Sequence, residues 1–272
     1  MGRIRPMVKI HGGKYYLSDW VISHFPADYE QYGYIEPFFG GGSVFLNKNP
    51  SHYEVINDVD ETIYSIVVAM HVYPQEFMYE LSQVSYDELT FKNALELYNK
   101  PNFFLLGDVE KAVTSYIVCR MSRGGLRKSF AWSERFRGGK PGDLNAWQSA
   151  LRELPLLAER LSRAVFYHDD FRSIFRDYQG HYWFYYLDPP YLHETRGKSA
   201  RKSYRHEMTK NDHIELLNCC LAHKGKILLS GYDNDLYNFM LSGWNKVTKE
   251  VANHSQQTPT KTKKIECLWR NY

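Results

Sequence analysis

The sequence predicts an α/β fold around an open sheet, because short apolar strands alternate with helix-like segments in both halves of the chain. The clearest strand is 182–187, a continuous aromatic run that is typical of a strand buried on both faces. Pro189 and Pro190 end this strand, since proline lacks an amide donor and restricts the residue before it. The tail, 247–251 with 265–271, indicates an antiparallel pair.

The other elements follow the same alternation. A glycine-rich element, His11-Gly12-Gly13-Lys14, opens a helix-like stretch to about Phe25. We also expect a helix from Val59 onward, with Glu61 and Thr62 in its first turn. The remaining expected elements are strands at 34–36, 53–56, 165–167 and 227–232, and a helix at about 210–223.

The middle of the chain differs in character. Residues 66–160 have helical patterns and few strand signals, and glycine-rich breaks interrupt them at 123–126 and 137–142. We therefore expect a main domain formed by 1–65 and 161–272. An inserted helical subdomain at 66–160 would carry a basic loop or hairpin.

Composition narrows the class of protein. The 272 residues fit one large domain or a domain with an insertion. The sequence has no run of 18 apolar residues and no apolar segment behind its first residues, so we expect a cytosolic protein that does not bind a membrane. We also expect a monomer. A zinc site is not expected, because the cysteines lack C-x-x-C spacing. We expect them to be buried free thiols: Cys119, Cys219, Cys220 and Cys267.

Positive charge is unevenly distributed although the net charge is only +3. The stretch 120–140 holds seven Lys or Arg and a single acid, Glu134, and 196–210 holds six and a single acid, Glu207. Such clusters are typical of surfaces that meet a phosphate backbone. Solvated loop faces would explain either cluster alone about as well.

The tetrapeptide Asp188-Pro189-Pro190-Tyr191 is the most informative motif. It follows the buried strand, and ligands of open α/β sheets bind at the carboxyl ends of strands. A carboxylate, carbonyls without ladder partners and an aromatic face would suit a flat ring that bears an amine, such as a nucleobase. A plain strand-ending turn is the alternative.

A second ligand element joins a glycine loop to an acid. The loop Phe39-Gly40-Gly41-Gly42 lies between a strand and a helix, where glycine lets a ligand approach the backbone. Asp58 ends the next strand, 18 residues after Gly40, and an acid about this far on holds ribose hydroxyls in dinucleotide folds. The loop holds no basic residue for a pyrophosphate, which favours an adenosine ligand without phosphates. Structural glycine turns are the alternative.

Two weaker signals complete a nucleoside site. Lys14 follows a glycine pair and could meet a carboxylate, although an exposed loop lysine is the commoner case. Asp169-Asp170-Phe171 would bring a carboxylate to an adenine amine and a ring to the purine. Asp170 could instead, or in addition, cap a helix.

Together these motifs resemble the Dam-like, D12-class DNA N6-adenine methyltransferases nearly from end to end. The segments that match the family's motifs, in its order, are Lys9–Lys14, Glu36–Leu46, Asn57-Asp58, Asp170-Phe171 and Asp188–Tyr191. The resemblance implies a Rossmann-like AdoMet-dependent methyltransferase sheet with an inserted helical DNA-recognition subdomain. It also implies a bacterial or phage-encoded enzyme that methylates N6 of a flipped-out adenine in double-stranded DNA, with S-adenosyl-L-methionine as cofactor and no metal.

The resemblance assigns roles to residues. Asp188, Pro189, Pro190 and Tyr191 are its catalytic motif: the Asp188 carboxylate and the Pro189 carbonyl would each accept an amine hydrogen, and Tyr191 would stack on the base. Ile10 and His11 depart from the family's Trp and Ala, so Ile10 would contribute packing or backbone. The residues expected to bind the cofactor are Ile10, Lys14, Phe38, Phe39, Gly40, Gly42, Ser43, Asp58, Asp170, Phe171 and Asp188.

DNA contacts are expected in the two basic stretches and beside the first motif. The polar residues that read GATC in the best-known members are not evident in the insert, so the target sequence stays open. The residues expected to contact DNA are Lys9, Arg120, Arg123, Arg127, Lys128, Arg135, Arg137, Arg201, Lys202 and Tyr204.

The sequence alone leaves other functions open. A fold of this kind also serves amino-methylation of cytosine N4, RNA bases or protein glutamine. A catalytically silent DNA-binding module would have no AdoMet affinity. An NAD-dependent enzyme is disfavoured because the loop is not G-x-G-x-x-G.

Overall fold

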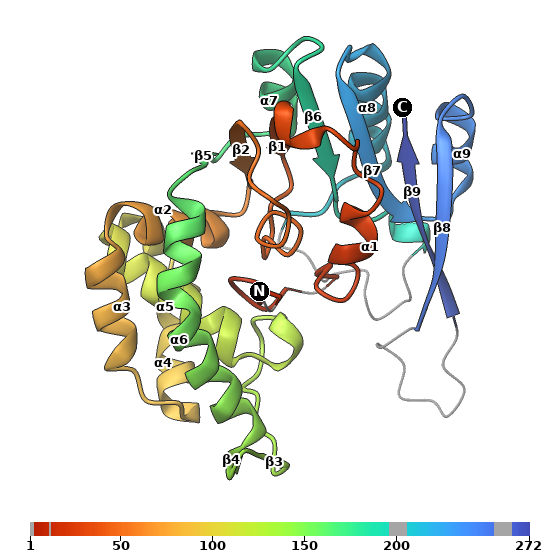
Figure 1. The fold of residues 1–272 in the computed structure, drawn as a ribbon. Coiled ribbons are helices and arrows are strands. Elements are labelled where there is room, and N and C mark those ends of the chain that lie inside the picture. The colour runs from red at the N-terminus through yellow and green to blue at the C-terminus, as the bar shows by residue number, and fades with distance from the viewer. Residues whose placement is uncertain (1–2, 11, 196–205, 253–262) are drawn as a thin grey trace. The chain divides into compact units, whose positions relative to one another are not determined.

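The computed structural model describes residues 3–10, 12–195, 206–252 and 263–272. Its main element is a seven-stranded sheet in the order β5-β2-β1-β6-β7-β9-β8. The pairs β1–β2, β1–β6 and β6–β7 are parallel, whereas β9 pairs antiparallel with both β7 and β8. The predicted α/β class is confirmed (Figure 1). The strands are β1 Gly33–Glu36, β2 Tyr53–Asn57, β5 Val165–Tyr167, β6 Trp183–Leu187, β7 Lys226–Tyr232, β8 Asn245–Ala252 and β9 Lys263–Arg270.

The chain divides into two compact units, each described by itself. One, here the helical unit, comprises Met1–Ile22, Phe39–Lys48 and Asp58–His168. The other, here the sheet unit, comprises Ser23–Phe38, Asn49–Asn57 and Asp169–Tyr272. Three of the divisions lie close to strand ends: two residues after β1, directly after β2 and one residue after β5.

The sheet unit contains all strands of the sheet except β5, and its interior is largely aromatic. Phe184 and Tyr185 of β6 are fully buried and point to opposite faces, because successive strand residues alternate. The Tyr185 ring stacks on Phe175 with centroids 4.6 Å apart, while the Phe184 ring meets Phe25 edge-on at 4.7 Å. Both faces of β6 are therefore covered, which explains its continuous apolar run. The helices here are η1 Tyr29–Gln31, α7 Phe171–Asp177, η4 His193–Thr195, α8 Lys210–Ala222 and α9 Asp235–Met240.

The helical unit has its own buried contacts between helices. Thr62 and Tyr98 hydroxyls lie 2.8 Å apart, and the Ser65 hydroxyl donates to that of Ser115 at 3.2 Å. Rings of Phe77 and Tyr116 meet edge-on. The helices are α1 Ser18–Ile22, α2 Glu61–Val72, α3 Pro74–Ser82, α4 Glu88–Tyr98, η2 Phe103–Leu105, α5 Asp108–Met121, η3 Arg123–Gly125 and α6 Gly142–Leu161, beside a short hairpin of β3 Phe136–Arg137 and β4 Lys140–Pro141.

Local chemistry explains where several helices begin. Asp60 caps α2 and Asp170 caps α7, each through its carboxylate to a backbone N–H. Thr209 and Asp212 form a capping box at α8. The first helix is shorter than predicted and ends at Ile22 rather than near Phe25. Pro26 accounts for part of this, because the residue before a proline disfavours helical geometry.

Candidate active site

The end of β6 carries the tetrapeptide in the middle of the sheet unit. Leu187, the last residue of β6, pairs with Leu229 of β7, and Asp188 follows it directly. Asp188 is half-buried and Pro189 is buried. Beneath them the hydroxyls of Tyr186 and Ser230 lie 3.0 Å apart. The carboxylate thus starts from a rigid, packed strand, which is how a site is held in fixed geometry.

Two buried glutamates accept hydrogen bonds from tyrosines near this strand end. Glu36, at the end of β1, accepts from Tyr34 at 2.6 Å. Glu266 of β9 accepts from the Tyr191 hydroxyl of the tetrapeptide, whose ring also meets Tyr232 edge-on at 4.7 Å. Burial, reinforced by the neighbouring acids, raises the pKa of Tyr34 and of Tyr191 well above the ordinary value, so both hydroxyls stay protonated donors. Tyr191 is thereby anchored at both its ring and its hydroxyl.

Asn57 joins the segments that leave neighbouring strands. Its amide nitrogen donates to the carbonyls of Pro37 and Asp169, both at 2.9 Å, and its amide oxygen accepts from the Asp169 N–H at 2.9 Å. It is 1% exposed, so these hydrogen bonds replace water fully. The sequence analysis read Asn57 only as part of a pair with Asp58. Its position at the last residue of a buried strand was the available signal for this role.

Phe38 and Phe171 form an aromatic face in the sheet unit. Their ring centroids are 5.6 Å apart, and Phe171 begins α7. Asp170 caps that helix by accepting from the Arg172 N–H at 2.9 Å, and the Arg172 guanidinium binds the same carboxylate. Arg172 also reaches Asp212 of α8 and lies over the Phe171 ring at 4.5 Å. Both sequence readings of Asp170 are therefore compatible, since a carboxylate can accept further hydrogen bonds.

Asp58 and the glycine loop meet in the helical unit. The Asp58 carboxylate accepts from the Gly40 N–H at 2.6 Å and from the Asp60 N–H at 2.9 Å. Desolvation, with Asp60 as a second cause, raises the pKa of Asp58 to about 6. The sequence spacing of Gly40 and Asp58 thus corresponds to a direct hydrogen bond.

Backbone conformation and close packing both require glycine in this loop. Gly40 and Gly42 have φ of +53° and +69°, and a β-carbon on Gly42 would lie 2.5 Å from the Phe39 ring. The backbone of the amino-terminal segment lines the loop, where the Met7 N–H donates to Gly41 at 3.0 Å. Ser43 is buried at the following turn. A loop backbone hydrogen-bonded to an acid, with no cation in residues 37–47, fits the neutral adenosyl part of a cofactor better than a pyrophosphate.

Ile10 and Lys14 belong to the same unit. The Ile10 side chain reaches within 3.5 Å of the point where Gly40 would carry a β-carbon, so it packs beside the loop. Lys14 is 6% exposed, and its ammonium lies 3.5 Å from the Gly12 carbonyl. Its expected contact with a ligand carboxylate stays a prediction.

Most of the chain matches one known protein family. Residues 11–256 match the family described as D12 class N6 adenine-specific DNA methyltransferase. The chain belongs to this family. The family implies a DNA substrate and a methyl donor of the AdoMet type.

Relatives of the D12-class chain include bacterial proteins named DNA adenine methylase and a bacterial type II methyltransferase. It is 26% identical to a DNA adenine methylase of Vibrio cholerae over 194 residues, which is 70% of this chain and 66% of the relative, so this chain spans just under two thirds of that protein. It is 25% identical to a DNA adenine methylase of Salmonella typhi over 243 residues, 87% of this chain and 84% of the relative. It is 26% identical to the type II methyltransferase M1.LlaDCHI of Lactococcus lactis subsp. cremoris over 286 aligned positions, 99% of this chain and 96% of the relative.

The residues expected to contact DNA differ in their exposure to solvent in this D12-class chain. Arg123, Lys128 and Arg135 are exposed. Arg120 is 7% exposed and donates to the carbonyls of Met7 and Pro6 at 3.1 and 2.6 Å. Lys9 pairs with Asp143 at 3.7 Å, and Arg127 also has internal partners. The side chain of Arg137 is not described. Arg201, Lys202 and Tyr204 lie outside the described residues.

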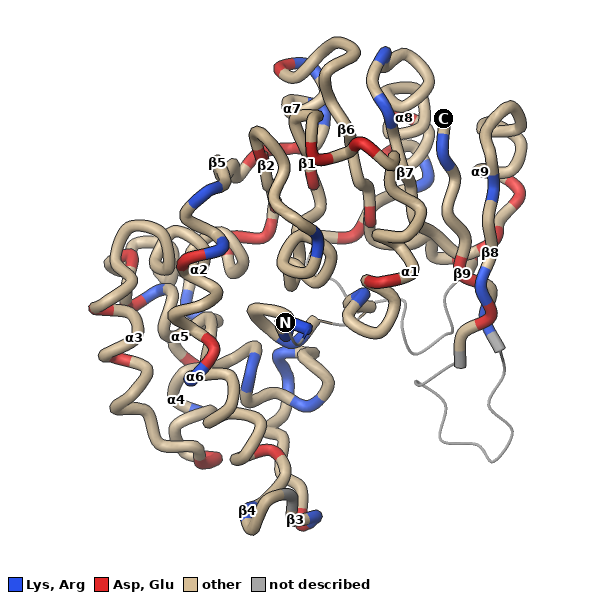
Figure 2. The backbone as a smooth tube through the Cα atoms, in the orientation of Figure 1, with Lys and Arg blue, Asp and Glu red and all other residues tan. Residues whose placement is uncertain are grey.

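The basic loop after α5 lies against the amino-terminal segment within the helical unit. A β-carbon on Gly125 would lie 2.4 Å from the Lys9 carbonyl, so only glycine allows this approach. Figure 2 shows Lys and Arg along both segments. Desolvation lowers the pKa of Lys9, and the charge of Arg120 acts in the same direction while Asp143 opposes it. The segment that holds Ile10 and Lys14 is therefore continuous with a basic surface.

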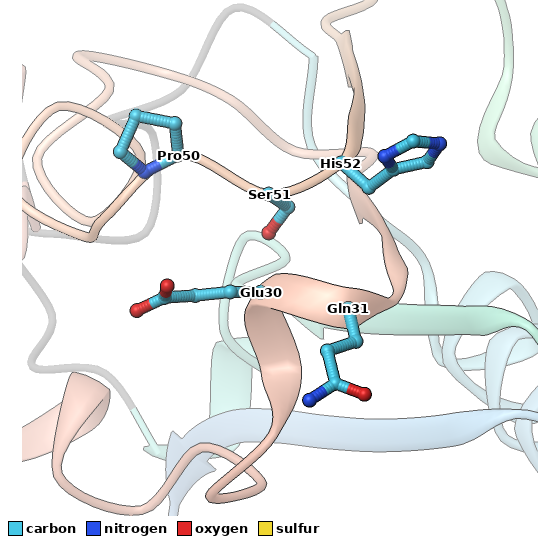
Figure 3. Close-up of a pocket in the computed structure, with 5 residues that line it drawn as sticks. All are labelled: Glu30, Gln31, Pro50, Ser51 and His52. Carbon is cyan, nitrogen blue, oxygen red and sulfur yellow. The ribbon is translucent and has the colours of Figure 1, made fainter.

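A hollow of about 600 Å³ lies elsewhere in the sheet unit (Figure 3). It borders the turn before β2, at the amino end of that strand, whereas Asp188 follows the carboxyl end of β6. The turn is held internally, since the Asn49 amide donates to Glu30 at 2.8 Å. We assign the hollow no part in the active site. Its lining residues are Glu30, Gln31, Pro50, Ser51 and His52.

Two further properties concern only the part of the chain that the structure describes. There, no group of three or more His, Cys, Asp or Glu side chains is arranged to hold a metal ion. In the same residues, no helix is both long and apolar enough to cross a bilayer.

Proposed function

We propose that this chain transfers a methyl group from S-adenosyl-L-methionine to N6 of an adenine in duplex DNA. The observation that carries the proposal is Asp188-Pro189-Pro190-Tyr191 at the carboxyl end of β6, in a chain that belongs to the D12 class. The strands β2, β1 and β6 are consecutive in the sheet. The segments that leave their carboxyl ends, including Asp58 and the glycine loop, therefore start from one edge, which is the ligand edge of such sheets.

Asp188 and Pro189 would act on the adenine amine. The N6 lone pair is delocalised into the ring, which makes the amine a weak nucleophile. The Asp188 carboxylate and the Pro189 carbonyl would each accept one amine hydrogen and draw the nitrogen towards tetrahedral geometry. The half-buried position of Asp188 supports this role, since preorganised acceptors are most effective where water is scarce.

Tyr191 and Pro190 would hold the base. The Tyr191 ring would stack on the adenine, and its hydrogen bond to Glu266 fixes the ring before the base arrives. Pro190 restricts the backbone between acceptor and ring. Preorganisation of this kind lowers the entropy that must be lost when the substrate is positioned.

We assign contacts with the cofactor to residues of each unit. When bound, AdoMet supplies a methyl group on a positively charged sulfonium. Asp58 would accept from the ribose hydroxyls, and Lys14 would meet the methionine carboxylate. The adenine ring would lie by Phe38 and Phe171, whose rings are already in contact and tilted by 39°. Asp170 would accept from the ring amine, and Asp188, Ile10, Phe39, Gly40, Gly42 and Ser43 would complete the surroundings.

DNA would be held mainly by the insert at 66–160. A duplex adenine must leave the stack before it can reach Asp188, which costs a few kcal/mol. Phosphate contacts from Arg123, Lys128 and Arg135 would offset that cost, because all three are exposed. We propose Lys9, Arg201, Lys202 and Tyr204 as further contacts.

The test is methyl transfer from labelled AdoMet to duplexes of random sequence, with product analysis by mass spectrometry. We expect N6-methyladenine, and no incorporation into duplexes in which every adenine is already methylated at N6. Exclusive N4-methylcytosine, or methylation of RNA instead of DNA, would overturn the proposed substrate. No incorporation anywhere, together with no affinity for AdoMet, would leave a DNA-binding module and overturn the proposed reaction.

A further inference from the structure

Arg127 lies in the basic loop but faces inward. Its guanidinium forms an ion pair with Asp60 at 2.7 Å and donates to the hydroxyls of Thr62 and Tyr98, both at 3.0 Å. The Arg127 side chain is only 15% exposed and that of Asp60 only 14%. All four residues belong to the helical unit. The pair links the loop after α5 to the first turn of α2.

The backbone of Arg127 is held in an uncommon geometry for this contact. Its φ is +55°, the only positive φ outside glycine among the described residues. That conformation is unfavourable for a residue with a β-carbon. The Arg127 N–H donates to the Ser122 hydroxyl at 3.1 Å, which helps to hold the turn. A strained residue whose side chain is removed from solvent is poorly suited to a phosphate contact and well suited to an internal one.

The partner of Arg127 stands beside the acid proposed to bind ribose. The Asp60 N–H donates to the Asp58 carboxylate, so the two acids lie within one turn of chain. Two carboxylates this close and partly buried repel each other unless a cation balances them. Arg127 is the cation that touches Asp60, and its charge also acts on Asp58 in the direction that favours ionisation.

The other titratable groups near the turn include Glu61 and the buried thiol of Cys119, which interacts with the Arg127 guanidinium. Glu61, next to Asp60, binds Lys111 of α5 at 2.9 Å and His168 at 3.5 Å. The Gly40 N–H is the contact to Asp58 from the glycine loop. Arg127 therefore provides the compensating charge for the Asp58–Asp60 pair, while Lys111 balances Glu61.

We propose that Arg127 is a positioning residue for the cofactor acid Asp58: by neutralising Asp60 it keeps Asp58 ionised and ready to accept ribose hydroxyls, and it makes the basic loop part of the cofactor site. The proposal rests on the proposed function in one respect, the role of Asp58. It replaces the phosphate contact expected for Arg127. A carboxylate accepts hydrogen bonds more strongly than a neutral acid, so the charge on Asp58 matters for binding.

The experiment measures two quantities in the same variants between pH 5 and pH 8. One is the pKa of Asp58 in the protein without ligand, from carboxyl carbon NMR. The other is the affinity for S-adenosylhomocysteine, from calorimetry. In Arg127→Met we expect the pKa of Asp58 to rise by about one pH unit above its starting value. Affinity at pH 6 then falls about fivefold relative to the parent protein, and the difference shrinks at pH 8.

A rescue variant separates charge balance from structural support. Asp60→Asn removes the repulsive charge and still caps α2, because asparagine is an equally good cap. We expect the double variant Arg127→Met with Asp60→Asn to return the pKa of Asp58 close to the parent value. Asp60→Asn alone should lower it, which keeps the proposal testable if Arg127→Met fails to fold. Arg127→Lys, which retains the charge, should stay near the parent value.

A neighbouring arginine provides the matched control. Arg123→Met changes an exposed arginine of the same loop, so we expect weaker DNA binding with an unchanged pKa of Asp58. Equal loss of affinity at every pH in Arg127→Met, or no rescue by Asp60→Asn, would overturn the proposal. A parent protein that does not bind S-adenosylhomocysteine would instead count against the proposed function, while the NMR titration would still report on the ion pair.

Discussion

The ends of β6 and β2 each present an aspartate, but the two carboxylates have different surroundings. Asp188 follows a strand supported by hydrogen bonds between neutral hydroxyls and by buried tyrosine–glutamate pairs. Asp58 lies next to Asp60, with Arg127 as the balancing charge and with a pKa raised to about 6. The comparison teaches that one acid depends on rigid geometry and the other on local charge. We therefore expect the effects of changes at Asp58 to depend on pH.

The largest effect is expected from Asp188→Ala. Removing the acceptor should lower the rate of methyl transfer by about 10³-fold, since a preorganised polar partner of the transition state contributes that much. The melting temperature should stay within a few degrees of the parent, because Asp188 ends the strand rather than filling the core. Incorporation from labelled AdoMet and thermal unfolding are the measurements. Turnover close to that of the parent protein would show that Asp188 takes no part in the reaction.

Asp58→Asn should act more weakly and in opposite directions on binding and stability. Loss of the charged acceptor should weaken S-adenosylhomocysteine binding by one to two powers of ten, as expected for hydrogen bonds to a charged group. The folded-state pKa of Asp58 is above its unfolded value of 3.8, so ionisation of Asp58 destabilises the fold as pH rises from 3.8 through 6. Asp58→Asn should therefore raise the melting temperature at pH 8.

The pH dependence of that variant is its internal control. Below pH 3.8 Asp58 is protonated in both folded and unfolded protein, so the gain in stability should vanish there. A gain of equal size at pH 4 and pH 8 would contradict charge as the cause. The contrast with Asp188→Ala would then lose its basis.

Charge reversal on the exposed part of the basic loop should reduce DNA affinity by about tenfold. Replacing Arg123 and Lys128 by glutamate removes two candidate phosphate contacts, so the slope of log affinity against log salt should decrease in magnitude by about 2. Filter binding or fluorescence anisotropy at several salt concentrations measures it. The matched control reverses Arg163 and Lys224, two exposed cations outside both basic stretches. An identical slope in test and control would exclude the loop as a phosphate contact.

Tyr191→Phe should have the smallest effect on turnover, a decrease of a few-fold. The ring remains for stacking, but the hydrogen bond to Glu266 is lost. Because Glu266 is 3% exposed, leaving it with one donor fewer should cost about 1–3 kcal/mol of stability. Chemical denaturation and steady-state kinetics would test this pairing. A decrease as large as that of Asp188→Ala would mean that the hydroxyl itself takes part in the reaction.

Several structural features were readable from sequence for local reasons. The aromatic run before Asp188, the helical stretch with breaks near 123 and 137, and the antiparallel tail all appear as predicted. Each depends on periodicity or on proline and glycine, which act over a few residues. Gly40 and Asp58, which the sequence analysis linked by their 18-residue spacing, are joined by a hydrogen bond from the Gly40 N–H to the Asp58 carboxylate. The D12-class family, identified from five ordered motifs, is confirmed.

Other features depend on contacts between distant parts of the chain. Sequence reasoning assigned Arg120 and Arg127 to DNA as members of a basic cluster, but both side chains have internal partners, and the role we now propose for Arg127 follows from its ion pair with Asp60. Glu266 lies 75 residues from Tyr191, so no local pattern could join them. Asn57 likewise bonds to Asp169, 112 residues away.

The sequence alone determined the class of fold, the family and which acids directly follow β2 and β6. These follow from short-range patterns, because strand burial, proline and glycine geometry, and motif order are written along the chain. Only the tertiary structure decided which charges are buried against partners and which remain exposed. A lysine or arginine carries the same charge in either case, and its role depends on whether folding brings an acid such as Asp60 to it.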